Sequence, residues 1–203
     1  MSGGYLAVSL LDMIEEIGEV ETRVILSDFS CPLNRDVEKF LLGRNAIDLA
    51  KQNISPTQLV FTSFRGEIRL IGYYTLTVKS FCIAPSTLSV NLKKKINKFG
   101  TYDKLQKTYR VPAPLIAQIG KNFTDNLNEL ITGAELLDMA VQKVSIAQQS
   151  VGGKVVYLEC EDKPKLIDFY GNNGFVEFDK RLLGRDEVAD LDGSYLIQML
   201  RII

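Results

Sequence analysis

The distribution of apolar and polar positions predicts an alternation of strands and helices that starts near the beginning of the chain. Two runs between residues 58 and 78, rich in β-branched and aromatic residues, flank the turn Arg65-Gly66-Glu67, a pattern typical of a β-hairpin. The β-branched run 23–29 predicts an earlier strand. Between them, an apolar face over 37–50, which begins after the potential capping residue Asn34, predicts a helix.

The second half of the chain continues this order. Apolar strands are predicted at 112–122 and 155–160, and strands at 176–178 and 195–203 follow. A long helix beginning near Leu130–Gly133 is predicted between the first two, because apolar residues recur there at spacings of three and four, namely Gly133, Leu136, Leu137, Ala140, Val141, Val144 and Ala147. Pro164 and Gly174 delimit a short helix, since proline favours the first turn and glycine the left-handed exit.

The segment 165–175 carries the most specific motif. It reads Lys-Leu-Ile-Asp-Phe-Tyr-Gly-Asn-Asn-Gly-Phe and resembles the Ala-x-x-Phe-Tyr-x-x-x-Gly-Phe pattern of the GNAT family of N-acetyltransferases, with Leu166 in the alanine position. The order of elements from about residue 23 to 203 is also similar to that family. The resemblance implies an α+β, GNAT-like acyl-CoA N-acyltransferase fold, with a mixed central sheet of about six to seven strands and helices on both faces.

The sequence predicts one domain over 1–203, with a leader at 1–22 and a substrate-side insertion at 79–111. Residues 86–110 are locally basic, because they contain one acid, Asp103, against Lys93, Lys94, Lys95, Lys98, Lys104, Lys107 and Arg110. A solvated helix and loop would explain this composition. A substrate-side lid or a contact with a nucleic-acid backbone would explain it as well.

Composition narrows the chemistry further. The 203 residues carry a formal net charge of −1, which argues against a general polyanion binder. The absence of histidine excludes Ser-His-Asp and Cys-His catalysis, and no metal site is predicted. Three separated cysteines (Cys31, Cys82, Cys160), no secretory signal and no apolar run near the ~20 residues of a membrane span predict a cytoplasmic protein without a membrane partner.

The turn before the long helix is the candidate cofactor site. A helix N-terminus offers unpaired N–H groups and partial positive charge to a pyrophosphate. The family pattern Gln/Arg-x-x-Gly-x-Gly/Ala falls on 128–133, where Gly133 fits and Asn128 and Ile131 depart from it. The resemblance implies acetyl-CoA as cosubstrate, with its pyrophosphate on Asn128, Leu130, Ile131, Thr132, Gly133 and Ala134. It also implies that the strand backbone at Ile119, Gly120 and Lys121 holds the pantetheine arm and polarises the thioester carbonyl.

Two side chains are candidate catalytic groups. Tyr170 matches the family's general acid, which protonates the departing thiolate, although a packed core tyrosine would also suit this helix. Glu159, on the strand before that helix, is the carboxylate candidate for a general base.

The resulting hypothesis is an N-acetyltransferase that moves the acetyl group to the amine of an unidentified acceptor by direct attack. The alternatives are a tRNA-directed acetyltransferase of the toxin type and a catalytically weak CoA-binding or interaction module. The sequence leaves a homodimer open, and leaves a nucleic-acid partner open without favouring it.

Overall fold

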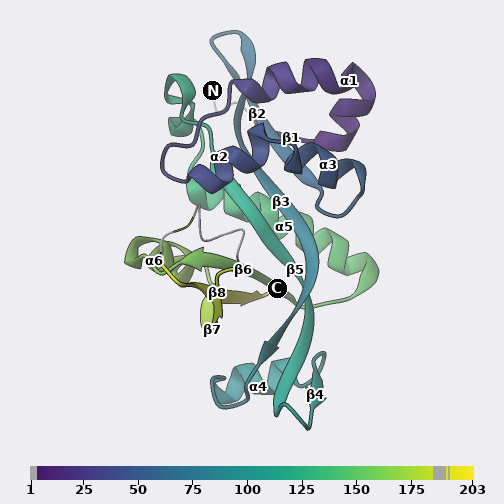
Figure 1. Ribbon diagram of the computed structural model, residues 1–203, viewed down its shortest axis with the longest axis vertical. Coiled ribbons are helices and arrows are strands. Elements are labelled where there is room, and N and C mark those ends of the chain that lie inside the picture. The colour runs from purple at the N-terminus through teal and green to yellow at the C-terminus, as the bar shows by residue number, and fades with distance from the viewer. Residues whose placement is uncertain (1–3, 185–190, 192) are drawn as a thin grey trace. The chain divides into compact units, whose positions relative to one another are not determined.

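The computed structural model describes residues 4–184, 191 and 193–203, which form a mixed α+β structure (Figure 1). Its eight-stranded sheet has the order β1-β2-β3-β5-β6-β8-β7, with β4 paired to β5. The strands are β1 (Leu6–Ser9), β2 (Thr57–Phe64), β3 (Glu67–Ile83), β4 (Thr101–Asp103), β5 (Thr108–Lys121), β6 (Val155–Glu161), β7 (Val176–Leu182) and β8 (Tyr195–Ile202). The helices are α1 (Leu10–Ser27), α2 (Arg35–Leu42), α3 (Asn45–Lys51), α4 (Val90–Ile96), the 3-10 helix η1 (Thr124–Glu129), α5 (Gly133–Val151) and α6 (Pro164–Asn172).

The predicted mixed sheet is confirmed. The pair β5–β6 is parallel, whereas β1–β2, β2–β3, β6–β8 and β7–β8 are antiparallel. The chain divides into two compact units, one made of Met1–Thr77 and Ala117–Ala140 and the other of Val78–Ile116 and Val141–Ile203. None of the helices in the described ranges is long and apolar enough to cross a membrane.

In the first unit, helices α1, α2 and α3 lie beside strands β1, β2 and β3, as the purple and blue ribbons of Figure 1 show. Their buried apolar side chains form one core. At its centre the ring of Tyr73 meets Phe29 edge-on, with 5.3 Å between the ring centroids, and the Tyr73 hydroxyl donates a 2.6 Å hydrogen bond to the carbonyl of Val37. This bond satisfies the only polar atom of a side chain that burial would otherwise penalise.

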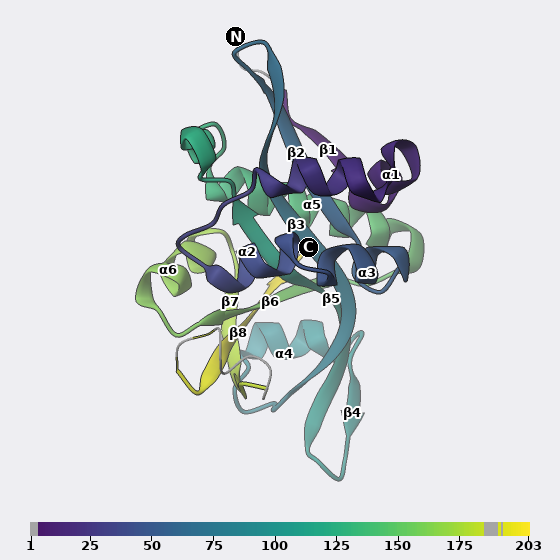
Figure 2. The ribbon, with the colours of Figure 1, turned by 45° about the horizontal axis from the view of Figure 1, so that its top comes forward.

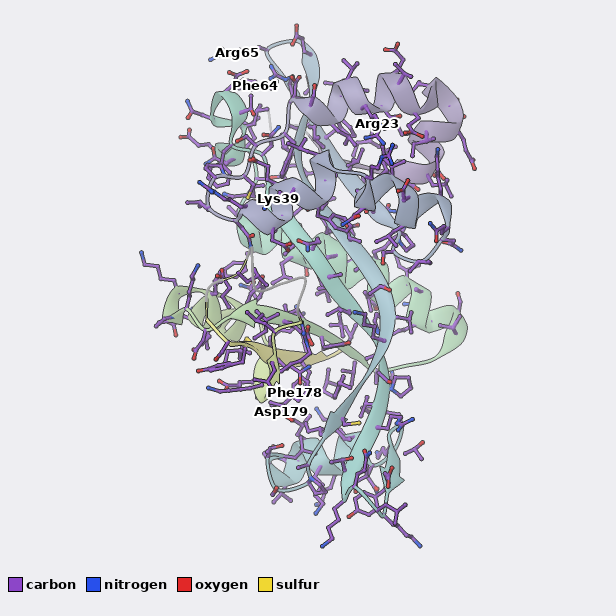
Figure 3. All side chains as sticks on the ribbon, viewed as in Figure 1. Arg23, Lys39, Phe64, Arg65, Phe178 and Asp179 are labelled. Atoms are coloured by element: carbon purple, nitrogen blue, oxygen red, sulfur yellow. The ribbon has the colours of Figure 1, made fainter. Side chains whose placement is uncertain are left out.

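The predicted hairpin is confirmed as β2 and β3. Their turn is formed by Arg65 and Gly66, both with positive φ, and the Arg65 guanidinium lies 4.8 Å from the centroid of the Phe64 ring (Figure 3). Strand β3 extends to Ile83, beyond the predicted end at residue 78.

Two predictions for the early helical region are wrong. The run 23–29 is not a strand, because α1 continues to Ser27. Thr22 and Leu26 are buried four residues apart, so the helical burial of this face outweighs the β propensity of the branched residues between them. The single helix predicted over 37–50 is two helices, α2 and α3, separated by Gly43 and Arg44. The predicted cap is correct: the Asn34 side chain accepts from two backbone N–H groups of α2.

Two glycines allow close packing around β5. A Cβ atom added to Gly72 would lie 2.9 Å from the carbonyl oxygen of Gly120 and 3.1 Å from Leu136 of α5. A Cβ atom added to Gly120 would collide with Val37 of α2. The position of Gly120 in β5 therefore suits a residue without a side chain, and the helix in contact with it is α2.

In the second unit, Phe81 of β3 packs against Tyr157 of β6 and Phe178 of β7, at ring centroid distances of 4.9 and 4.6 Å. The last residues of β3 and the first residues of β5, together with α4 and β4 between them, form an arm that is drawn in teal in Figure 2. Ile96 of α4 is buried in this arm, and the Tyr109 hydroxyl donates a 3.1 Å hydrogen bond to Asn97. Residues 86–110 thus contain a helix, as the interpretation of a solvated helix and loop requires, and its three consecutive lysines are exposed.

Buried acidic groups predict loss of stability in alkali. Burial raises the pKa of the Cys160 thiol from 9.0 to about 12 and that of the Tyr74 phenol from 10.0 to about 12. A group whose pKa is higher in the folded state stabilises the fold fully below its unfolded pKa, and this contribution is lost as the pH rises toward the folded pKa. We expect the melting temperature to fall progressively from pH 9 upward.

Thermal unfolding followed by circular dichroism between pH 7 and 11 measures this effect. Cys160→Ala should reduce the fall between pH 9 and 10, because Tyr74 begins to contribute only above its ordinary value of 10.0. An identical fall in the variant and the wild type over this interval would contradict the assignment to Cys160.

Candidate active site

The candidate residues at the end of β5 are held together by side-chain hydrogen bonds within the first unit. Lys121 Nζ donates to the carbonyl of Asn128 at 2.9 Å, which connects the strand end to η1. The next residue, Asn122, is 0% exposed and bonds four backbone groups: its Oδ1 accepts from Ser30 N and Thr124 N, and its Nδ2 donates to the carbonyls of Asp28 and Leu70. Hydrogen bonds therefore hold the end of β5, which contains Ile119, Gly120 and Lys121, beside the turn that contains Asn128.

The turn leads into α5 through a capping box. Thr132 Oγ1 accepts from Glu135 N at 3.1 Å, and Glu135 Oε2 accepts from Thr132 N at 2.8 Å and from Thr132 Oγ1 at 2.7 Å. The predicted start of this helix near 130–133 is confirmed at Gly133. The spacing Thr-x-x-Glu could have revealed the capping box, and sequence reasoning missed it.

The turn still offers donors to a diphosphate. Gly133 and Ala134 are the first two residues of α5, so their N–H groups have no acceptor within the helix. Ile131, which replaces the middle glycine of the family pattern, is 2% exposed and its side chain is buried in the protein. The backbone of the turn therefore fits an anion at Gly133 and Ala134.

One acidic group lies on the same turn. Hydrogen bonds from Thr132 hold the pKa of the Glu135 carboxyl below its ordinary value, so this side chain is negatively charged at neutral pH. The Tyr5 hydroxyl lies 3.1 Å from the Leu130 carbonyl and 3.2 Å from Glu135 Oε1. Both donors of Thr132, its N–H and its hydroxyl, are bonded to the Glu135 carboxylate.

In the second unit, Tyr170 lies on α6, which begins at Pro164 and is followed by Gly174 with a φ of +82°, as predicted. Tyr170 is 9% exposed and lies between Phe169 and Phe175, at ring centroid distances of 5.0 and 6.1 Å. Its hydroxyl makes no hydrogen bond to any residue in the described ranges. Burial, with a smaller effect of Cys160, raises the pKa of Tyr170, so the phenol keeps its proton well above neutral pH.

Glu159 lies in a cleft of the second unit, with a volume of 730 Å³. Its Oε2 accepts from Nε and Nη2 of Arg181, each at 2.8 Å, and its Oε1 accepts from Nε2 of Gln198 at 2.7 Å. A carboxylate can accept about four hydrogen bonds, and Glu159 already accepts three from Arg181 and Gln198. Its oxygens are therefore largely occupied and poorly placed to act as a base toward a substrate amine. The other lining residues are Lys79, Ser80, Phe81, Cys82, Tyr157, Lys180, Leu182 and Gly184.

Sequence reasoning missed the partners of Glu159. Gln198 lies opposite Glu159 in the β6–β8 register, and Arg181 is on β7, so only the pairing of distant strands brings them together. No contact joins Glu159 to Tyr170 among the described interactions. Within the described residues, no group of three or more cysteine or carboxylate side chains could hold a metal ion.

The chain is similar to known proteins in its three-dimensional structure, whereas comparison of sequences finds no match. No protein-family model and no curated protein sequence matches the chain. AtaT complexed with acetyl-methionyl-tRNAfMet is 17% identical, with a TM-score of 0.60 and coverage of 96% of this chain and 94% of that one. A tyrosine-to-phenylalanine mutant of KacT is 17% identical, with a TM-score of 0.61 and coverage of 95% and 93%.

A third structure contains a cosubstrate. It is a mutant AtaT toxin bound to the C-terminus of the antitoxin AtaR and acetyl-CoA, 18% identical, with a TM-score of 0.55 and coverage of 87% of this chain and 84% of that one. These similarities extend over nearly the whole chain. The GNAT-like fold that the sequence predicts is therefore confirmed.

Proposed function

We propose that the protein is an acetyl-CoA-dependent N-acetyltransferase whose acceptor amine belongs to an aminoacyl-tRNA. The observation that supports the enzymatic part is Tyr170, a buried residue whose hydroxyl makes no hydrogen bond in the described chain. Thr108 Oγ1 is the only fully buried side-chain polar atom without a partner among the described residues, so the Tyr170 hydroxyl is not sealed off from solvent or from a bound ligand. A phenol left unpaired on a helix that matches the family motif is suited to serve a bound thioester.

The first unit would hold the cosubstrate. The N–H groups of Gly133 and Ala134, together with the positive end of α5, would receive the pyrophosphate of acetyl-CoA. The backbone of Ile119, Gly120 and Lys121 would bond the pantetheine arm. When bound, acetyl-CoA supplies an activated acetyl thioester, and the remaining chemistry falls to residues of this chain.

The reaction needs one proton donor and one source of oxyanion stabilisation. The neutral acceptor amine attacks the thioester carbonyl, forming the C–N bond as the C–S bond breaks. Backbone N–H groups near Ile119–Lys121 stabilise the negative charge on the carbonyl oxygen. Tyr170 donates its proton to the departing sulfur, and its raised pKa keeps that proton available at neutral pH. The amine loses its extra proton to solvent, so Glu159 is not required as a base.

Two features support a tRNA acceptor over a small amine. One of the similar structures is that of AtaT complexed with acetyl-methionyl-tRNAfMet. In this chain, Lys93, Lys94 and Lys95 are exposed on α4 of the arm. The nearby acid Asp103 accepts hydrogen bonds from Leu105 N and Gln106 N within its own turn, at 2.8 and 3.0 Å. The lysines are therefore available to the phosphates of a nucleic acid.

The double variant Lys94→Glu/Lys95→Glu tests this acceptor. We expect acetylation of aminoacyl-tRNA to fall by at least roughly tenfold at physiological salt, and the slope of log affinity against log salt to decrease by about 2, since each lost phosphate contact lowers it by about one. Rates with charged tRNA at several salt concentrations measure both effects. The charge-matched control is Lys143→Glu/Lys154→Glu, which changes two exposed lysines outside the arm. Equal losses in the two variants would contradict a tRNA contact on α4.

A second function, an interaction module without turnover, is favoured by one observation. Glu135 uses the amide and hydroxyl of Thr132, which belong to the turn expected to bind pyrophosphate. Calorimetric titration of the wild-type protein with acetyl-CoA distinguishes the two functions. Micromolar binding supports the transferase, and absence of binding at millimolar concentration supports the module.

A further inference from the structure

We infer that Glu135 and Tyr5 regulate cosubstrate binding, because their contacts use groups of the turn to which the proposed function assigns the pyrophosphate. This inference rests on the proposed function. It assigns to Glu135 the role of an internal competitor for the phosphate donors, and to Tyr5 that of a group that holds Glu135 in place.

The contacts of Glu135 carry the first step. Its Oε2 accepts from both donors of Thr132, the backbone N–H at 2.8 Å and the hydroxyl at 2.7 Å. A donor hydrogen that points at one carboxylate oxygen cannot be shared fully with a phosphate oxygen. Of the amides at the start of α5, the N–H of Glu135 is bonded to Thr132 Oγ1, which leaves those of Gly133 and Ala134. A diphosphate can therefore use the complete turn only after the Glu135 side chain has moved.

The negative charge of Glu135 also opposes binding of a pyrophosphate. Glu135 is exposed, and the hydrogen bonds of Thr132 and Tyr5 favour its charged form. A carboxylate and a pyrophosphate placed on the same donors repel each other. A second acid, Glu129, is also exposed in this segment but makes no hydrogen bond or ion pair among the described contacts. Glu135 occupies the Thr132 donors, whereas Glu129 is an acid of the same segment that does not. Comparing the two acids therefore separates the effect of occupied donors from the effect of negative charge.

Tyr5 carries the third step. It precedes β1, which is paired with β2 from Leu6↔Phe61 to Ser9↔Gln58, so its backbone is anchored in the sheet. Its hydroxyl reaches the carbonyl of Leu130 at 3.1 Å and Glu135 Oε1 at 3.2 Å, across more than a hundred residues of sequence. The N-terminal strand is thereby connected to the cosubstrate turn. Release of Glu135 requires that the Tyr5 contact be broken.

The test is calorimetric titration of Glu135→Gln with acetyl-CoA. We expect about tenfold tighter binding than in the wild type, since the neutral amide oxygen of glutamine is a weaker acceptor for the Thr132 donors than a carboxylate and gives them up more readily to a diphosphate, while it still caps the helix. S-acetylpantetheine, which has no diphosphate, should bind both proteins equally. Tyr5→Phe should tighten acetyl-CoA binding by about threefold, because it removes the hydroxyl alone.

Glu129→Gln is the control for charge, and it should change affinity far less than Glu135→Gln does. Equal affinities of wild type and Glu135→Gln for acetyl-CoA would overturn this inference while leaving the proposed function intact. Equal gains in Glu135→Gln and Glu129→Gln would also overturn it, since charge alone would then account for the effect. Failure of all variants to bind acetyl-CoA at millimolar concentration would overturn the proposed function and this inference with it.

Discussion

Tyr170→Phe is expected to lower kcat for acetyl transfer by about 10²- to 10⁴-fold, with little change in the affinity for acetyl-CoA. The substitution removes one hydroxyl that makes no hydrogen bond within the described protein, so the fold loses no internal interaction. The departing thiolate loses its proton donor. Steady-state rates, calorimetric affinity and the melting temperature, measured on the same preparation, separate the chemical effect from an effect on folding.

Tyr73→Phe is the matched control for this prediction. Tyr73 is 0% exposed, and its hydroxyl donates to the carbonyl of Val37 at 2.6 Å. Its loss should lower the free energy of unfolding by about 1 kcal/mol or more and leave kcat nearly unchanged. A Tyr170→Phe protein with full turnover would show that Tyr170 is only a packing residue.

Asn122→Ala is expected to lower the free energy of unfolding by about 3–5 kcal/mol, which places it among the most damaging single substitutions. The side chain is 0% exposed and bonds four backbone groups, those of Asp28, Ser30, Leu70 and Thr124. Alanine would leave buried N–H and C=O groups without partners, and each unpaired group costs about 1–3 kcal/mol. Urea denaturation followed by circular dichroism measures the change.

Asn172→Ala, at the exposed end of α6, is the control and should change stability by no more than about 0.5 kcal/mol. Because Asn122 directly follows the strand that would hold the pantetheine arm, its loss should weaken acetyl-CoA binding as well. A loss below about 1 kcal/mol for Asn122→Ala would mean that the surrounding backbone finds other partners.

Locally determined features were predictable from the sequence, and features that depend on distant strands were not. Pro164 and Gly174 set the ends of α6 through their own backbone preferences, so this helix was predicted correctly. In contrast, the strand predicted at 23–29 is helical, because burial of Thr22 and Leu26 decides the conformation of that segment. Local propensity does not report such tertiary burial.

The candidate site follows the same division. Thr132 and Glu135 are three residues apart, so their capping box was readable in principle. The contact of Tyr5 with Glu135 and the contacts of Glu159 with Arg181 and Gln198 depend on sheet register, which one sequence does not specify. The roles predicted for Tyr170 and Glu159 remain predictions that the proposed experiments test.

The discontinuity of the first unit has a consequence for biosynthesis. Its residues 1–77 are separated from 117–140 by the arm and the strand ends of the second unit. On the ribosome, β3 therefore emerges well before β5, and the backbone edge that β5 later covers is exposed to other chains in the meantime. Asn122 joins Ser30 and Asp28 across separations of 92 and 94 residues, so the first unit completes its hydrogen bonds only late in translation. Nascent chains halted within the arm would be the ones most in need of a chaperone.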